Sequence, residues 1–208
     1  GEIRYRILGD LDGAFKHYNN IIQNNRNKKY IVDSIVRLVD IYIAKGNMVK
    51  AKSILSRYND DYRVIDDDIA LSIKEAQVYL YAGNIDSLSK FLENTFSNLS
   101  LKNNWYNDIL ELRSLLFDFN QKPELFKLFS ESQLLLKKNK REEALRKIYQ
   151  IIELSEVPLL NAIKYQASYI LVLQGNYKEA LDLIDDLEGE SLYIELSIIL
   201  KGEIYDYI

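Results

Sequence analysis

The chain contains no cysteine, one histidine, two prolines and eight glycines among its 208 residues. Without cysteine it has no disulfides, no thiolate metal ligands and no cysteine nucleophile. So few glycines and prolines argue against an all-β protein with many tight turns, and no segment alternates as strands do. The absence of cysteine leaves the compartment open between the cytoplasm and, if a leader or lipid anchor lies upstream, the periplasm.

The chain also lacks long apolar runs and an excess of basic residues. No apolar run reaches the length of a membrane span, and no segment has the pattern of a signal peptide, so we expect no direct membrane insertion. The formal charge is −4 and the pI is near 5.2, which argues against nucleic acid as a partner. With 48% apolar residues the chain can bury a continuous core.

What is present is a turn that opens a helix, Gly175-Asn176-Tyr177-Lys178-Glu179-Ala180-Leu181, and copies of it recur along the chain. Glycine fits a helix C-terminus because it adopts positive φ without a Cβ clash, and asparagine is the next best residue there. An alanine five residues after the turn residue lets two helices approach closely. The step recurs from Gly9 to Ala14, Gly46 to Ala51, Asn139 to Ala144 and Gly175 to Ala180, and with leucine from Gly83 to Leu88 and Asn120 to Leu125.

The turn residues lie at positions 9, 46, 83, 120, 139 and 175, which are 37, 37, 37, 19 and 36 residues apart. A pair of helices needs about this length, so the period predicts stacked helical hairpins. Helical spacing of apolar residues predicts helices over 11–25, 28–45, 48–58, 69–82, 85–96, 101–119, 123–138, 141–155, 158–174, 177–187 and 190–207.

The 19-residue step breaks the alternation, because 123–138 would be the second helix of one pair and the first helix of the next. Either 101–119 is an extra helix outside the alternation, or it pairs with 123–138, and 123–138 then also belongs to the following repeat. We therefore divide the chain into hairpins over 1–100, an extra or irregular helix over 101–122, and hairpins over 123–208 that end in an unpaired helix. By the repeat register Gly1 falls inside a first helix and Ile208 just before the next turn, so we expect the segment to belong to a longer protein.

Further residues follow the same register. A tyrosine precedes three turn glycines by four residues, at Tyr5, Tyr42 and Tyr79. Near the end of the chain a small residue, Gly202, is followed three residues later by an aromatic residue, Tyr205. This pattern resembles the tetratricopeptide repeat family, in a degenerate form of bacterial type. The resemblance implies an all-α, right-handed α-solenoid of helical hairpins, here with an irregular joint in the middle, and a scaffold that binds proteins.

Residues for catalysis or metal binding do not assemble in the sequence. His17 is the only histidine, and a lone histidine without cysteine is a poor metal site. The run Asp66-Asp67-Asp68 precedes a helix, where carboxylates cap free N–H groups. No Gly-rich phosphate loop is present, and no carboxylate pair is shown to converge. We expect no enzyme, no catalytic residue, no metal and no cofactor.

The resemblance implies that the first helix of each repeat lines a concave groove for a peptide or protein. Carrying the family's groove positions over to this chain gives the following candidate partner-binding residues: Asp40, Gln77, Phe129, Gln133, Tyr165 and Tyr169. The competing interpretation is that apolar residues at these positions pack against the neighbouring repeat. Tyr165 and Tyr169 lie one turn apart and keep hydroxyls that prefer a wet or hydrogen-bonded end, which makes them the foremost candidates.

The sequence thus predicts a non-catalytic protein–protein interaction scaffold, part of a larger protein or assembly, with a concave groove. The alternative is a structural or regulatory repeat segment that positions an attached catalytic, DNA-binding or membrane-anchored domain. A third interpretation is self-association through the open terminal helix.

Overall fold

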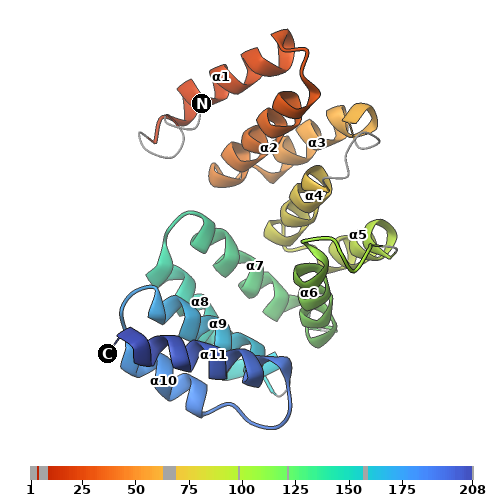
Figure 1. Cartoon of the computed structure of the whole chain (residues 1–208). Coiled ribbons are helices and arrows are strands. Elements are labelled where there is room, and N and C mark those ends of the chain that lie inside the picture. Colours follow the sequence, from red (N-terminus) through yellow and green to blue (C-terminus); the bar gives the residue numbers. More distant parts are fainter. Residues whose placement is uncertain are drawn as a thin grey trace. The chain divides into compact units, whose positions relative to one another are not determined.

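The computed structural model describes residues 4, 9–62, 69–97, 99–120, 122–156 and 159–207, and for residues 59–62 it describes the backbone alone. In this part of the chain eleven α-helices follow one another and no residue lies in a β-strand (Figure 1). The all-α class predicted from the sequence is therefore confirmed. The run Asp66-Asp67-Asp68 and Tyr5 lie outside the described residues.

The chain divides into two compact units, Gly1–Thr95 and Phe96–Ile208. The first unit contains α1 (Leu11–Asn24), α2 (Lys28–Ala44), α3 (Met48–Tyr62), α4 (Ala70–Tyr81) and α5 (Ile85–Phe96). The second contains α6 (Tyr106–Asp118), α7 (Pro123–Lys137), α8 (Arg141–Leu154), α9 (Leu159–Val172), α10 (Tyr177–Asp185) and α11 (Leu192–Tyr207).

The helix boundaries lie within two residues of those predicted, except at the end of α3 and the start of α6. Helix α3 continues four residues past Tyr58 because no glycine or proline follows to stop it. Helix α6 begins five residues later than predicted. Ser100 Oγ and Asn103 Oδ1 accept hydrogen bonds from the backbone N–H groups of Lys102 and Trp105, and such local bonds compete with a helix. Trp105 is thereby left at the N-cap of α6, with 40% of its surface exposed.

The repeated turns have the conformation that the sequence predicts. Gly9, Gly46, Gly83 and Gly175 have φ between 62° and 78°, and Asn139 has φ of 59°. At Gly46 the N–H bonds to the carbonyl of Ile43, and the next N–H bonds back to Tyr42, both at 2.8 Å. This is a Schellman motif, and the same pair of bonds closes the turns at Gly83, Asn139 and Gly175.

The residue after the turn glycine then starts the next helix. Asn47 and Asn84 accept hydrogen bonds through Oδ1 from the N–H groups of Lys50 and Ser87, at 3.0 and 2.9 Å. One two-residue turn therefore ends one helix and caps the next. Five residues after each turn residue the side chain has no exposed surface, at Ala14, Ala51, Leu88, Ala144 and Ala180.

The copy of the turn predicted at Asn120 is wrong. Asn139 is the one non-glycine residue with positive φ in the described ranges, and Leu125 is only partly buried, whereas Phe126 is fully buried. Here Pro123 begins α7, where its missing N–H costs no helical hydrogen bond. Phe119, at the end of α6, packs against Phe126 at 5.5 Å between ring centroids.

In the first unit α2 contacts α1, α3 and α4. Ala14, Tyr18, Leu38 and Ile41 form a buried cluster between α1 and α2. Two of the tyrosines that precede the turn glycines pack between helices. Tyr42 meets Phe15 of α1 edge-on at 5.7 Å, and Tyr79 of α4 lies 5.5 Å from Phe91 of α5, so it fills the gap within its own hairpin.

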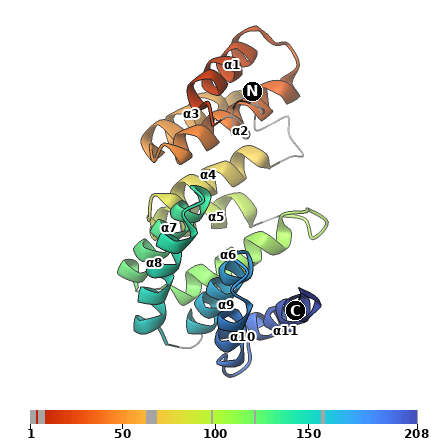
Figure 2. The same cartoon turned by 90° about the vertical axis from the view of Figure 1, so that its left-hand side faces the viewer.

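In the second unit α9 contacts α6, α8, α10 and α11, and nine of its 14 residues are buried (Figures 1 and 2). Three of those nine are polar, and two of the three, Asn161 and Lys164, bond to the connection that leads to α11. Lys164 forms an ion pair with Asp186, and Asn161 donates to the carbonyl of Glu188 at 2.6 Å. Helix α9 is therefore the element around which the second unit is built.

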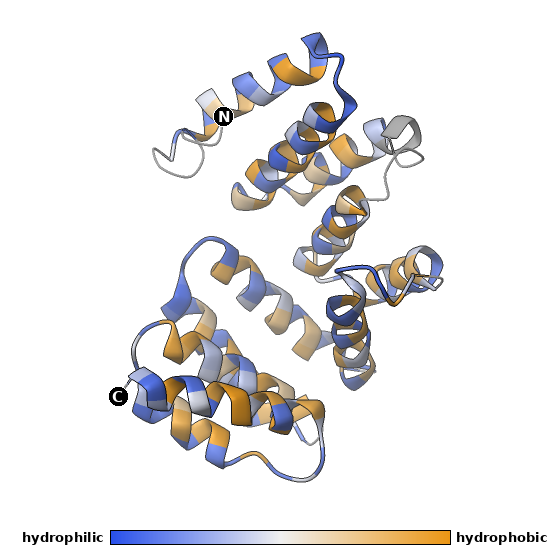
Figure 3. Ribbon diagram, viewed as in Figure 1, coloured by the Kyte–Doolittle hydropathy of each residue, from blue (hydrophilic) through white to orange (hydrophobic). Residues whose placement is uncertain are grey.

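Helix α11 contacts α9 and α10 but keeps an apolar surface, and hydrophobic colour covers much of its ribbon (Figure 3). Ile198 and Ile199 are 67% and 62% exposed, and Leu192, Tyr205 and Tyr207 are also exposed. Neighbouring Leu200 and Ile204 are buried. The helix is thus apolar on more than the face that it buries within the unit.

Candidate functional site

The groove positions predicted from the sequence lie on α2, α4, α7 and α9, and the structure gathers them into three local environments. Asp40 and Gln77 belong to the first unit. Phe129 and Gln133 lie on α7, and Tyr165 and Tyr169 lie on α9, in the second unit.

Asp40 and Gln77 are brought together by a lysine between them. Lys74 Nζ donates to Asp40 Oδ1 at 2.8 Å and to Gln77 Oε1 at 2.9 Å, and Arg37 approaches the second carboxylate oxygen at 3.5 Å. Asp40 is 2% exposed, so its charge is held inside the protein by these cations. This network joins α2 to α4.

Tyr81 of α4 responds to the same carboxylate. Burial raises its pKa to about 12, and the charge of Asp40 adds to the rise. The hydroxyl therefore stays protonated. In this arrangement Asp40 fixes α2 and α4 relative to each other, and Gln77 beside it is partly buried.

Phe129 and Gln133 differ in exposure although both lie on α7. Phe129 is 2% exposed, and its ring centroid lies 5.1 Å from Phe119 and 6.4 Å from Phe126, so three rings form one buried cluster. Gln133 is partly buried and donates to Gln166 Oε1 of α9 at 3.0 Å. Phe129 packs in the core of the second unit, whereas Gln133 bridges α7 and α9 near the surface.

Tyr165 and Tyr169 lie one turn apart on α9 and differ in the same way. Tyr169 is 48% exposed, which is unusual for a ring on a helix whose other faces are buried. Tyr165 is partly buried and packs against Tyr193 of α11, with 5.9 Å between ring centroids. Tyr165 thus packs against a buried ring of α11, whereas Tyr169, one turn away, keeps almost half of its surface exposed.

Tyr193 was not predicted, and it carries the most unusual polar group at this surface. It is 4% exposed, and its hydroxyl has no hydrogen-bond partner in the described part of the chain. A buried hydroxyl without a partner is costly, and most such groups in proteins are bonded. Burial raises the pKa of Tyr193, and the charges of Glu111 and Asp118 add to the rise.

Glu111 and Asp118 come from α6, seven residues apart and so on one side of the helix. Burial raises the pKa of both carboxyl groups. The charge of Asp108 raises the pKa of Glu111 further, whereas Lys122 opposes the rise at Asp118. Glu111 also raises the pKa of Tyr165, after burial, and Glu203 of α11 acts on the same hydroxyl. The charges of acids on α6 and α11 therefore raise the pKa of tyrosines on α9 and α11.

We name these six residues the acidic tyrosine surface: Glu111, Asp118, Tyr165, Tyr169, Tyr193 and Glu203. Sequence reasoning found two of them. It missed Tyr193 because the last helix was treated as lacking a partner, and it missed the α6 acids because an extra helix has no place in the repeat register. The seven-residue spacing of Glu111 and Asp118 is the sequence signal that would have placed them together.

His17 is exposed, and its ring meets that of Tyr18 edge-on at 6.0 Å. In the described ranges no three His, Cys, Asp or Glu side chains gather as metal ligands would. Over the same ranges, none of the helices combines the length and apolar character needed to cross a bilayer.

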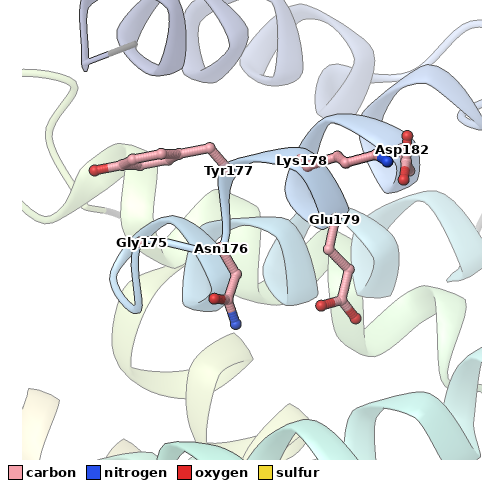
Figure 4. Close-up of a pocket in the computed structure, with 6 residues that line it drawn as sticks. All are labelled: Gly175, Asn176, Tyr177, Lys178, Glu179 and Asp182. Atoms are coloured by element: carbon pink, nitrogen blue, oxygen red, sulfur yellow. The ribbon is translucent and has the colours of Figure 1, made fainter.

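A shallow hollow also lies at the turn between α9 and α10, lined by Gly175, Asn176, Tyr177, Lys178, Glu179 and Asp182 (Figure 4). Its side chains point in different directions, and two are occupied elsewhere. The ring of Tyr177 stacks on Tyr207 at 5.9 Å, and Glu179 accepts a hydrogen bond from Tyr149 at 2.6 Å. The hollow is a consequence of the turn and does not present a set of convergent groups.

Comparisons of the chain with family models, with curated proteins and with solved structures returned no match.

Proposed function

We propose that this chain is a tetratricopeptide-like, right-handed solenoid that acts as a non-catalytic scaffold and binds a protein or peptide partner through its first helices. The observation that carries the proposal is the exposed ring of Tyr169 beside the partly buried ring of Tyr165. Tyrosines that combine a packed edge with an exposed one are typical anchors of protein interfaces. Gln133 and Gln77 supply amides at corresponding positions on α7 and α4.

The proposal is tested with a random peptide library panned against the whole chain, followed by affinity measurements on selected peptides. Tyr169→Ala should weaken binding by about tenfold, the size expected for loss of an interface anchor. Tyr30→Ala is the matched control, because Tyr30 is 56% exposed on α2 of the first unit. Circular dichroism checks that both variants remain helical. Equal affinities of parent and Tyr169→Ala would contradict the proposal.

The alternative function is a repeat segment that positions an attached catalytic, DNA-binding or membrane-anchored domain. The observation that favours it is the exposed apolar surface of α11 at Ile198 and Ile199.

The same surface also suits self-association of the chain. Self-association predicts that the mass measured by sedimentation velocity rises with protein concentration, and that Ile199→Lys abolishes this rise. Val49→Lys is the control, because Val49 is 81% exposed on α3. A mass independent of concentration would contradict self-association.

A further inference from the structure

The helices that precede the repeated turns bury the residue that lies seven positions before the turn residue. On α2, α4, α7 and α9 this residue has at most 5% of its surface exposed, and the four residues are Val39, Ala76, Ser132 and Ser168. On α11 the corresponding residue is Gly202, because Tyr205 follows it by three positions as Tyr79 follows Ala76. Gly202 is exposed. A face that is buried on the other four helices is therefore open on α11.

On the other helices this face is covered by the helix that follows the turn. Lys50 of α3 lies over the ring of Tyr42 of α2, 5.9 Å from its centroid, and Phe91 of α5 lies 5.5 Å from Tyr79 of α4. Each of these tyrosines comes three residues after the buried position and so lies on the same side of its helix. Helices α2, α7 and α9 each contact the helix that follows (Figure 1). The element that fits the open face of α11 is therefore another helix.

We define the open stripe as six residues of α11 that recur at helical spacing: Glu195, Ile198, Ile199, Gly202, Tyr205 and Asp206. The two isoleucines and the tyrosine are 57–67% exposed. A Cβ added at Gly202 would meet no atom within 4 Å, so a second helix can approach the backbone closely at this point. The open stripe shares no residue with the acidic tyrosine surface.

The open stripe is apolar in the middle and acidic at both ends. Glu195 and Asp206 are exposed, and in the described part of the chain neither forms an ion pair. The one basic residue of α11, Lys201, is already paired with Asp185 of α10. Two α11 helices from separate copies would bring like charges together, whereas a helix with basic residues would bring opposite ones. The charges therefore favour a basic helix over a second copy.

We propose that the open stripe binds a helix of another protein, with a small residue in the middle of its apolar face and basic residues toward both ends. This helix packs along α11 as α3 packs along α2, with its small residue against Gly202 and its basic residues beside Glu195 and Asp206. The proposal goes beyond the proposed function, because it concerns a second surface and does not involve Tyr165 or Tyr169.

The chain itself supplies two matched probes for this proposal. Residues 47–58 lie in α3 and its cap, with three basic residues, no acid and the buried Ala51. Residues 176–187 include α10, with four acids, one base and the equivalent Ala180. Synthetic peptides of these two sequences are titrated into the whole chain by calorimetry. We expect the basic peptide to bind about tenfold more tightly than the acidic one.

The first variant closes the point of closest approach. Gly202→Leu adds a side chain that meets open space in the free chain, so the chain should stay folded while its affinity for the basic peptide falls about tenfold. Ser114→Leu is the matched control, because it adds the same side chain at an exposed position on α6 of the same unit. Equal affinities of the two variants for the basic peptide would overturn the proposal.

The second variant removes the two acids. Glu195→Gln with Asp206→Asn should bring the affinities for the basic and acidic peptides within about twofold of each other. Glu124→Gln with Glu142→Gln is the control, because it removes the same charge from exposed positions on α7 and α8 and should keep the preference for the basic peptide. If the control lost the preference as fully, net charge alone would explain binding and the proposal would be overturned.

A second measurement supplies the helix at high local concentration, since short peptides are only partly helical in water. A copy of residues 46–58 is joined directly after Ile208, which places its glycine four positions after Tyr205, as Gly46 follows Tyr42. This chain should melt at a higher temperature than one joined to a copy of residues 175–187, and Gly202→Leu should remove the difference. Absence of both peptide binding and this difference would overturn the proposal.

The remaining outcomes separate this proposal from the proposed function. Loss of the basic peptide with Tyr169→Ala but not with Gly202→Leu would overturn the proposal and support the proposed function. Binding of the basic peptide that is lost with Gly202→Leu would support the proposal even if Tyr169→Ala changed the affinity of no selected peptide. A mass that rises with concentration in the parent but not in Gly202→Leu, without peptide binding, would assign the open stripe to a second copy and overturn the proposal.

Discussion

Two glycines of the second unit allow the same substitution to be compared in two backbone conformations. Gly175 has φ of 78°, and Gly202 lies inside α11, and a Cβ added at either would meet no neighbouring atom. We expect Gly175→Ala to destabilise the unit by about 1 kcal/mol through left-handed strain, and Gly202→Ala to stabilise it by up to about 1 kcal/mol. Urea unfolding measures both, and shifts of the same sign would contradict the assignment of Gly175 as the turn residue.

Two lysines form short ion pairs at very different depths. Lys74 pairs with Asp40 at 2.8 Å, where the side chains are 13% and 3% exposed, and Lys45 pairs with Asp12 at 2.6 Å, where they are 39% and 84% exposed. We expect Lys74→Met to lower the free energy of unfolding by about 3 kcal/mol, because it leaves the buried carboxylate of Asp40 with a weaker partner. Lys45→Met should change the stability by less than about 1 kcal/mol.

Chemical denaturation of the two variants checks this prediction. The comparison isolates burial, since the substitution and the type of pair are the same. Similar losses of unfolding free energy in both variants would mean that the ion pair between α2 and α4 contributes no more to stability than a surface ion pair.

Among the helices, α6 carries acidic side chains that lower the stability of the fold by an amount that depends on pH. A carboxyl group whose pKa is raised by folding is tolerated when protonated and opposes folding when ionised. The pKa of Glu111 is raised from an ordinary value of 4.5, so its unfavourable contribution is present near neutral pH and is lost as the pH falls through the raised pKa toward 4.5.

We therefore expect Glu111→Gln to melt at a higher temperature than the parent near neutral pH, with a difference that shrinks as the pH approaches about 4.5. Thermal melts followed by circular dichroism across this range measure it. Glu142→Gln, at an exposed acid of α8, should show no such trend. A difference that grows on acidification would show that the Glu111 carboxylate stabilises the fold.

The helices themselves could be predicted because their boundaries are local. Apolar spacing predicts each helix, and a glycine or asparagine with positive φ follows the ends of α2, α4, α7 and α9, so Gly46 and Asn139 are recognisable without any tertiary information. The start of α6 was predicted too early because the side chains of Ser100 and Asn103 accept hydrogen bonds from backbone N–H groups, and these bonds outweigh the apolar pattern. Helix propensity does not include that competition.

The candidate site could be predicted only in part, because a repeat register assumes that every first helix presents the same face. Helix α6 lies outside that register. Phe119 at its end packs against Phe126 and Phe129, and the charges of its acids raise the pKa of tyrosines on α9 and α11. Tyr165 and Tyr169 were found because they follow the register, whereas Glu111 and Tyr193 depend on which helices meet in three dimensions.

The molecule as a whole consists of two units, each with its own buried residues. Leu38 is 1% exposed in the first unit, and Ile163 has no exposed surface in the second. Truncating either to alanine should cost about 2–5 kcal/mol. We expect hydrogen exchange to accelerate mainly in α1 to α4 with Leu38→Ala and in α7 to α11 with Ile163→Ala, as local units open separately. Equal acceleration throughout the chain would show that it unfolds as one unit.

Trp105, at the N-cap of α6, gives the chain an intrinsic optical probe. It is the only tryptophan and is 40% exposed at the start of the helix that carries Glu111, so its fluorescence comes from the second unit alone. A change in its emission reports on the environment of α6 without any label. Because the chain has no cysteine, one introduced thiol would be a unique attachment point for an energy-transfer acceptor, and the separation between α6 and any chosen helix would become measurable in solution.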